Sequence, residues 1–351
     1  MPTLPRPRTS GNSRQPEQPE ASQAGSPRSE QGPGLVSRRR FDSKESKAAD
    51  AGFKALVVFC ALAVIAVVGL ILFELLSQSR LSMSKFGLKF LTKQIWDPVA
   101  EDFGALPFIY GTLVSSLVAL VLAVPLSVGT ALFLTEICPR RIRGILALLV
   151  ELLAAIPSVI YGLWGIFVLA PFLRRSIQPF LAKYLGWTGL FTGPKYGIGM
   201  LAAGVILAIM ILPIIASITR EVVMAVPRNQ REAALALGAT TWEMLRMSVL
   251  RNARGGILGA VILGLGRALG ETMAVTMVIG NRPEIAKSLF APGYTLASVI
   301  ANEFTEAVGN VYLSALVEMA LILFVLTLIV NALAGLLVWS ITRGMPSRTL
   351  A

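Results

Sequence analysis

The chain has 351 residues, of which 54% are hydrophobic and 15% charged, and its formal net charge is +12. A composition this apolar is typical of a polytopic membrane protein and excludes an ordinary soluble domain. There is no histidine, and the two cysteines, Cys60 and Cys138, are far apart in the sequence. We therefore expect no disulfide framework, no metal site and no cofactor.

Two further functional classes are disfavoured by the sequence. The basic residues lie in a tail and in short loops instead of on a folded face, so we do not expect nucleic acid as a partner. The chain has no GxxxxGK[ST] phosphate loop, and no nucleophile–base pair stands out in its apolar spans. We therefore expect that it is not an enzyme and does not hydrolyse nucleotide itself.

Residues 1–50 are rich in Pro, Ser, Gln, Gly and Arg and contain few large apolar side chains. Such a segment buries too little surface to offset the entropy lost on ordering, so we predict a disordered cytoplasmic tail. Residues 51–345 form the predicted membrane domain.

Six apolar spans follow the tail, each close to the roughly 20 residues that a helix needs to cross a bilayer. They cover residues 53–76, 108–135, 144–173, 197–219, 255–280 and 312–341. We expect all of them to be helical, because backbone in lipid must satisfy its own hydrogen bonds. The third and sixth are long enough to tilt or to contain a break, and Pro125, Pro157 and Pro213 are expected to kink the helices that contain them.

The distribution of Lys and Arg predicts the orientation. With the N-terminus inside, 21 of these residues lie in or next to cytoplasmic segments and 10 lie in outer loops. This bias predicts that both termini are cytoplasmic. The outer segment 80–107 mixes polar and apolar residues and fits either a short surface helix or a plain loop.

The cytoplasmic loop between the fourth and fifth spans, residues 226–256, has the signals of a helical hairpin. Pro227 is placed to start a helix, and Gly238 is a natural helix end. Thr240 and Glu243 have the spacing of a capping box that opens a second helix. The small residues Ala233 and Ala234 keep the first helix slim enough to enter a groove on another protein. The alternative is a stable hairpin with no partner.

This loop resembles the EAA loop of ATP-binding-cassette importer permeases. The match consists of Glu232, Ala233 and Ala234, followed after three residues by Gly238, and we place the loop at 226–252. In that family the loop forms a coupling helix that docks onto a separate ATPase subunit. The family's ending has an apolar residue and a proline where this chain has Ser248 and Arg251.

Two opposite charges lie inside the fifth apolar span, in the stretch GLGRALGETMAV, residues 264–275. Placing Arg267 near mid-bilayer costs about 2.5–3.5 kcal/mol on insertion scales. Glu271 is four residues further on, so on a continuous helix the two side chains share a face and can pair. Gly266 and Gly270 have the spacing that allows another helix to approach closely.

Two interpretations of this pair remain. In the first, Arg267 and Glu271 form a structural ion pair that fixes helix packing. In the second, Arg267 binds an anion on the translocation path, because its guanidinium matches tetrahedral oxyanions, and Glu271 positions it. Ser158 and Tyr161 lie just after Pro157, where freed carbonyls can line a cavity, so we add them as candidate path residues.

Most of residues 90–285 closely resembles one group of these permeases, the PstC-type subunits of phosphate importers. The matching stretches are 96–117, 156–173 and GLGRALGETMAVTMVIGN. The resemblance implies an all-α, type I importer permease in the bacterial inner membrane that carries inorganic phosphate. It also implies a second, PstA-type permease, two ATP-binding subunits and an extracytoplasmic phosphate-binding protein as partners, and it implicates Arg267 and Glu271 in transport.

Two alternatives to phosphate import are kept open by the residues themselves. One is an importer permease for another anion or solute, because an arginine recognises only negative charge. The other is an ion-coupled secondary transporter that needs no ATPase, in which case the loop at 226–256 would have no partner.

Overall fold

The computed structural model describes residues 43–342. The predicted tail therefore lies largely outside the described residues, but its last part does not: residues 43–50 are helical and belong to α1 (Ser43–Gln78). The described chain divides at Ala63/Val64 into two units, which we treat separately. The described part of the first unit is a single apolar helical stretch whose side chains from residue 50 onward are exposed.

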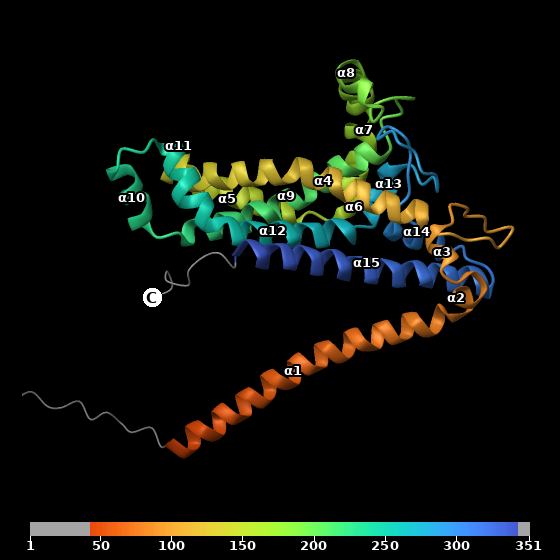
Figure 1. Cartoon of the computed structure of the whole chain (residues 1–351), viewed down its shortest axis with the longest axis horizontal. Helices are drawn as coiled ribbons and strands as arrows, with labels where there is room; N and C mark the ends of the chain where they lie inside the picture. Colours follow the sequence, from red (N-terminus) through yellow and green to blue (C-terminus); the bar gives the residue numbers. More distant parts are fainter. Residues whose placement is uncertain (1–42, 343–351) are drawn as a thin grey trace, which may run out of the picture. The chain divides into compact units, whose positions relative to one another are not determined.

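The second unit consists of the end of α1 and a bundle of helices that carries the membrane spans (Figure 1). Its elements are α2 (Arg80–Phe86), α3 (Lys89–Thr92), α4 (Leu106–Leu132), η1 (Phe133–Ile137), α5 (Arg140–Ala155), α6 (Ser158–Trp164), η2 (Gly165–Leu169), α7 (Ala170–Phe172), η3 (Leu173–Ile177), α8 (Gln178–Leu185), η4 (Gly186–Thr188), α9 (Met200–Ala225), α10 (Arg228–Ala236), α11 (Thr241–Met244), η5 (Leu245–Leu250), α12 (Arg251–Leu269), α13 (Met273–Ile279), α14 (Leu296–Glu303) and α15 (Asn310–Thr342).

The predicted fold class is confirmed. Six helices of the described chain are long and apolar enough to cross a membrane, and their bounds are Asp50–Gln78, Leu106–Ile137, Ser158–Thr188, Met200–Ala225, Thr241–Leu269 and Asn310–Ser340. No strand occurs among residues 43–342, where an isolated bridge joins Asp97 to Asp102. The largest differences concern the third and fifth expected spans. The expected third span, 144–173, is broken between α5 and α6, and the long helical stretch there is Ser158–Thr188. The expected fifth span, 255–280, is broken after Leu269, and the long helix there starts earlier, at Thr241.

The three prolines behave differently. The third span breaks at Ile156 and Pro157, where extended backbone separates α5 from α6. In contrast, α4 runs through Pro125 and α9 runs through Pro213 without ending. The difference follows from the residues that hold the helices together, because α4 and α9 pack along each other and Ser127 Oγ donates a hydrogen bond to Leu212 O at 3.1 Å, directly beside Pro213.

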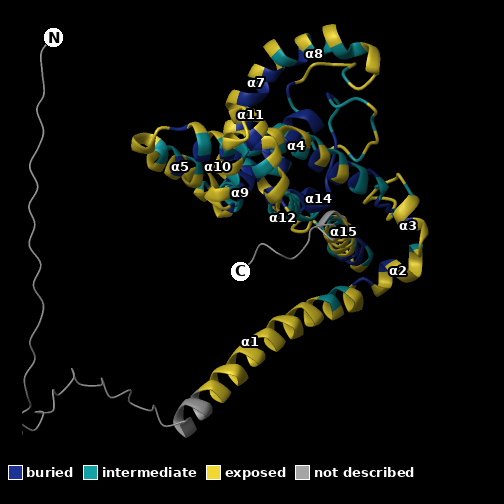
Figure 2. Cartoon of the chain, turned by 60° about the vertical axis from the view of Figure 1, so that its left-hand side comes forward, coloured by how far each residue is buried: buried dark blue, intermediate teal, exposed yellow. Residues whose placement is uncertain are grey.

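Helix α9 is the centre of the bundle. Of its most apolar stretch 67% is buried inside the chain, against 6% for α15. The main apolar cluster gathers residues of α4, α6, α9, α12 and α13 around Ile206, Ile211 and Ile215 of α9. The outward faces of α5 and α15 carry exposed leucine and isoleucine (Figure 2), as lipid-facing surfaces do.

The outer segment 80–107 combines both of the expected alternatives. Its first half forms the short helices α2 and α3, and its second half is a loop. Aromatic side chains of this segment pack with those of α4 and α15, and the rings of Phe103 and Tyr312 stack with centroids 5.2 Å apart. Glu303 accepts hydrogen bonds from Trp96 Nε1 at 2.8 Å and from the Tyr312 hydroxyl at 2.6 Å, which fixes the loop against α14 and α15.

The close approach of α4 and α9 depends on Gly204. A Cβ added there would lie 2.4 Å from Cγ1 of Val118, whose β-branched side chain has little freedom to move. Gly204→Ala should therefore reduce the free energy of unfolding by about 1–3 kcal/mol, the usual cost of overpacking. The measurement is the thermal unfolding midpoint of the purified protein in detergent. Gly129→Ala on α4 is the matched control, because nothing lies within 4 Å of its added Cβ; equal midpoints for the two variants would contradict the packing argument.

Candidate functional site

The fifth span is interrupted where the sequence places its two charges. Helix α12 ends at Leu269, Gly270 and Thr272 leave the helical path, and α13 begins at Met273. The two helices meet end to end, so carbonyl groups at the end of α12 and N–H groups at the start of α13 face one short connection. Interrupted spans of this kind are tolerated in membranes where the free backbone is covered by protein or lines a cavity.

Arg267 lies in the last turn of α12 and is exposed on the described chain. The partial negative charge at the C-terminus of a helix favours a cation at this position. Among residues 43–342 the guanidinium forms no ion pair. A free cation on the surface of a membrane span is costly if lipid covers it, so this face is expected to contact water or another protein.

Glu271 lies in the connection and is 9% exposed. Its Oε1 accepts a hydrogen bond from the backbone N–H of Ala274 at 3.4 Å, at the start of α13. An acceptor at this place compensates one of the N–H groups that a helix start leaves unpaired.

The expected side-chain pair between Arg267 and Glu271 is therefore not formed in the described structure. The i,i+4 spacing brings side chains together only on a continuous helix, and this helix ends between the two residues. Each charge is instead associated with a different helix end. Among the glycines of the stretch 264–275, the closest helix contact within the described chain is made by Gly264, with an added Cβ 2.8 Å from Ile215, whereas at Gly266 the nearest atoms belong to Asn331 of α15 at 3.9 Å; the Gly266–Gly270 pattern stays a prediction.

Tyr161 lies close to this break. Its ring belongs to the same apolar cluster as Ala268 and Ala274, and the charge of Arg267 acts on it electrostatically. Its hydroxyl donates to Leu153 O at 2.7 Å, so it satisfies a carbonyl freed by the Pro157 break. Ser158 is half-buried at the first position of α6, and its expected role stays a prediction.

The helices that carry these residues are held together by small residues. A Cβ added at Gly162 of α6 would lie 2.4 Å from Met277 Sδ and 3.2 Å from Ala274 Cα on α13. The break in the third span and the break in the fifth span therefore lie against each other, which brings Tyr161, Arg267 and Glu271 into one region.

The loop between α9 and α12 is the expected helical hairpin. Helix α10 starts after Pro227, and Gly238 adopts a φ of +84°, a conformation that favours glycine. The capping box is formed in both directions: the Glu243 N–H donates to Thr240 Oγ1 at 3.3 Å, and the Thr240 N–H donates to Glu243 Oε2 at 2.8 Å. Of the EAA residues, Glu232 and Ala233 are exposed, whereas Ala234 packs against an apolar cluster beneath the hairpin.

The second helix of the hairpin is also the start of the fifth span. From Thr241 the chain stays helical through α11, the π-helical turn η5 and α12, with no break until Leu269. Ser248 and Arg251, where the sequence departs from the family's ending, lie inside this continuous helix. A proline is absent at residue 251, so the helix passes through instead of ending.

A groove of about 660 Å³ lies between the two helices of the hairpin. The residues along it include Ala233, Leu237 and Gly238 on one side and Glu243 and Met247 on the other. Leu237 and Trp242 are 89% and 64% exposed. Apolar side chains this open at the end of a bundle indicate a surface that another protein covers.

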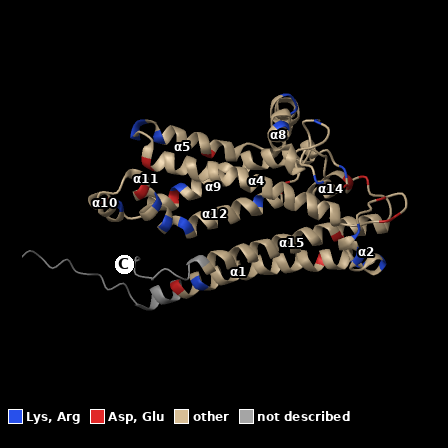
Figure 3. Cartoon of the chain, turned by 45° about the horizontal axis from the view of Figure 1, so that its top comes forward, with Lys and Arg blue, Asp and Glu red and all other residues tan. Residues whose placement is uncertain are grey.

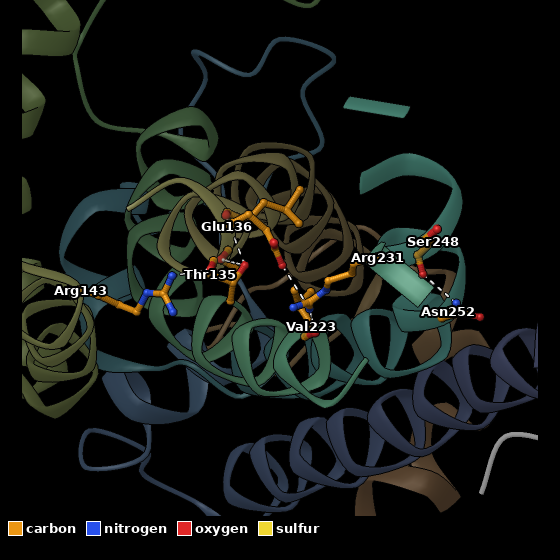
Figure 4. A network of polar contacts seen from close by, with 9 residues as sticks. Thr135, Glu136, Arg143, Val223, Arg231, Ser248 and Asn252 are labelled. Carbon is orange, nitrogen blue, oxygen red and sulfur yellow. Dashed lines mark hydrogen bonds and ion pairs between the residues drawn. The ribbon is translucent and has the colours of Figure 1, made fainter. Parts of the chain in front are cut away.

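Polar contacts that the sequence did not reveal tie the hairpin to the bundle (Figure 4). Arg231 Nη2 of α10 lies 3.1 Å from Glu136 Oε1 in η1 and donates to Val223 O of α9 at 2.7 Å. A separate contact, from Arg143 Nη2 to Thr135 O at 2.5 Å, joins the start of α5 to η1 and does not involve the hairpin. The signal in the sequence was weak, because Glu136 and Arg231 are 95 positions apart and either reads as an ordinary loop charge.

The fold and the hairpin together define the class: a polytopic helical membrane protein with a helical hairpin before its fifth span. Residues 123–343 match the family described as "Binding-protein-dependent transport system inner membrane component". The chain belongs to this family.

Curated relatives are similar over nearly their whole length. The "Phosphate transport system permease protein PstC" of Mesorhizobium japonicum is 50% identical over 306 residues, which cover 86% of this chain and 94% of the relative. The protein of the same name from Haemophilus influenzae is 47% identical over 290 residues, which cover 82% of this chain and 92% of the relative.

A solved structure shares the fold at low identity. It is a chain of a bacterial ABC transporter involved in the import of the acidic polysaccharide alginate, with a TM-score of 0.58 and 16% identity. The match covers 85% of this chain and 99% of that one. It supports the importer-permease fold of this chain.

The capping box should set the local stability of the hairpin's second helix. Thr240→Ala removes the N-cap acceptor, which typically costs about 1 kcal/mol, and should make the amides of residues 241–250 exchange with solvent about fivefold faster. Hydrogen–deuterium exchange of the purified protein measures this. Thr241→Ala changes the neighbouring residue, which takes no part in the box, and should leave exchange unchanged; acceleration by both variants alike would count against the capping role.

Proposed function

We propose that this chain is a transmembrane permease subunit of an ATP-driven importer and that it moves inorganic phosphate into the cell. The observation that carries the proposal is the 50% identity to a phosphate transport permease over 86% of the chain. The partners it requires are a second, PstA-type permease, two ATP-binding subunits and an extracytoplasmic phosphate-binding protein.

Arg267 is the residue proposed to meet the anion. It is exposed, lies at a helix break and has no ionic partner among residues 43–342, so its five donors are available to a tetrahedral oxyanion. Glu271 lies two residues beyond the end of the same helix and places a negative charge nearby. That negative charge limits how tightly Arg267 holds an anion. Release of the anion into the cell requires such a limit. Tyr161 supports this region, and Ser158 is the more distant candidate.

The hairpin is the proposed receiver of ATP-driven movement. Glu232, Ala233, Ala234 and Gly238 form the surface for the ATPase, and α10 is slim enough to enter a groove. Because the second hairpin helix continues into α12, a push on the hairpin is transmitted along one helix to Arg267. Rigid movement of helices against each other is an established way to open a path alternately to the two sides.

The proposed location is the bacterial inner membrane, with both termini in the cytoplasm. Within the second unit, Lys and Arg gather at the end that carries α10, α11 and the start of α5 (Figure 3). This is the distribution that the positive-inside rule assigns to the cytoplasmic side.

The central test is Arg267→Ala in liposomes that contain the whole complex. Loss of a charge-assisted contact worth about 2–3 kcal/mol should lower phosphate uptake by about 100-fold with assembly intact. Arg267→Lys keeps the charge without the planar fork and should give an intermediate rate. The measurement is uptake of radiolabelled phosphate, with assembly checked by size-exclusion chromatography.

Arg282→Ala is the control, because it removes an arginine that is exposed in the outer loop after α13. Wild-type uptake in Arg267→Ala would refute the proposed role of this side chain. A different oxyanion that reduces the uptake of radiolabelled phosphate more strongly than unlabelled phosphate does would identify another substrate. Uptake without any ATPase subunit would identify a secondary transporter.

Docking of the ATPase should depend on the small side chain at residue 233. Ala233 is exposed and lines the groove of the hairpin, so Ala233→Leu leaves the fold of the chain intact but obstructs a close partner. We expect the ATPase to be lost when the complex is purified through the permease, measured as ATPase subunits recovered per permease.

Ala236→Leu on the same helix is the control, since Ala236 is exposed but does not line the groove. If Ala233→Leu recovers as much ATPase as wild type, the groove side of α10 is not the docking surface.

A further inference from the structure

An ion pair at the cytoplasmic end of the bundle has no part in the function proposed above. Arg231 Nη2 and Glu136 Oε1 are 3.1 Å apart, and the two side chains are 20% and 12% exposed. The same nitrogen donates to Val223 O at 2.7 Å. One guanidinium thus connects α10 with the inner end of the second span and with the last turn of α9 (Figure 4).

The surroundings make this connection rigid. Apolar side chains from α9, α11, η5 and α12 form a cluster at this end, with Leu132 of α4 and Ala234 of α10 packed against it. A charge pair beside such a cluster resists separation, because parting the two groups leaves a poorly hydrated charge without its partner. Apolar packing alone fixes no direction, whereas the hydrogen bond from Arg231 to Val223 O does, and the ion pair with Glu136 adds a second point of attachment.

The covalent connection between α9 and α10 is short, and the side chain of Val226 anchors it in this cluster. It consists of Val226 and Pro227, between the end of α9 at Ala225 and the start of α10 at Arg228. A force on α10 can be taken up by rotation about this connection, or it can move α9 and α4 as well. Arg231 spans the connection by reaching back from the first turn of α10 to Val223 and Glu136.

We propose that Arg231 and Glu136 are positioning residues for energy coupling, which make α10 and the inner ends of α4 and α9 move as one body. The inference rests on the proposed function, since it needs an ATPase that acts on α10. Without the ion pair, α10 pivots about Val226–Pro227, and ATP-driven movement is absorbed there before it reaches the spans.

The chain offers a matched control pair. Arg220 Nη2 lies 2.8 Å from Glu151 Oε1, an ion pair of the same chemistry at the same side of the bundle. It joins α9 to α5 and leaves α10 aside, and Glu151 is 49% exposed. Loss of this pair therefore removes a surface contact between spans without loosening α10.

The experiment measures phosphate uptake and ATP hydrolysis together in liposomes that contain the complete complex. Arg231→Gln with Glu136→Gln removes both charges at similar side-chain size and leaves no unpaired ion. We expect this double variant to assemble and to hydrolyse ATP, with the amount of phosphate carried per ATP lower by about tenfold. The double variant Arg220→Gln with Glu151→Gln should keep the wild-type ratio.

Single substitutions test whether the two residues act as a unit. Arg231→Gln alone and Glu136→Gln alone should each lower the ratio as far as the double variant does, because either one abolishes the same contact. The inference is overturned by a wild-type ratio in the double variant, by losses that multiply, or by uptake and hydrolysis that fall in equal proportion. An equal loss in the control pair overturns it too.

Arg231→Lys covers the case in which the glutamine variants do not assemble. Lysine keeps the charge, but its nitrogen ends one bond short of the Arg231 Nη2 that makes both contacts, so the ratio should fall by a smaller factor, and an unchanged ratio overturns the inference. Failure of the proposed function has a different signature: the wild-type complex itself would hydrolyse ATP without taking up phosphate. The ratio is then measured with the anion that the wild-type complex does import.

Discussion

A membrane span must satisfy its backbone hydrogen bonds internally, and the organisation of this protein follows from where the fifth span departs from that rule. Between Leu269 and Met273 the helix stops and restarts. The interruption is tolerable because α6 lies tightly against α13 through Gly162 and because Glu271 accepts the Ala274 N–H. The interruption also places two helix ends inside an apolar segment. The C-terminal end of α12 favours a cation, and the N-terminal end of α13 favours an anion. The charges of Arg267 and Glu271 are thus distributed over backbone dipoles instead of neutralising each other.

A second consequence of the fold concerns the mechanical connection between the hairpin and the helix that carries Arg267. No flexible loop separates the second half of the hairpin from the fifth span, because the capping box at Thr240 opens a helix that reaches Leu269. The other side of the hairpin is attached through Arg231, which donates a hydrogen bond to Val223 O of α9 and forms an ion pair with Glu136 of η1. Both sides of the hairpin are therefore firmly joined to the bundle, one by continuous helix and one by directed polar contacts.

The sequence predicted the features that depend on local pattern. The six spans follow from long apolar runs, and the hairpin follows from Pro227, Gly238 and the Thr240–Glu243 spacing, each of which acts within a few residues. The interruption at Gly270 was missed because one glycine in an apolar run is compatible with an unbroken helix, and its effect here depends on α6, which is about 100 residues away. The Glu136–Arg231 pair was not predicted for the same reason, because its two residues are far apart in the sequence. Pro125 and Pro157 likewise have the same local signature, and only packing decides which of the two helices ends.

The unbroken helix from Thr241 to Leu269 also limits how this segment can change over time. Successive residues of an α-helix differ by about 100° in direction, so adding or deleting one residue anywhere along it would turn the end that bears Arg267 by more than a quarter of a circle relative to the hairpin. Side chains on its lipid face are free to vary, but its length is not. The π-helical turn at Leu245–Leu250 is where an extra residue is already accommodated, and it sets the angular relation between the hairpin and the guanidinium of Arg267.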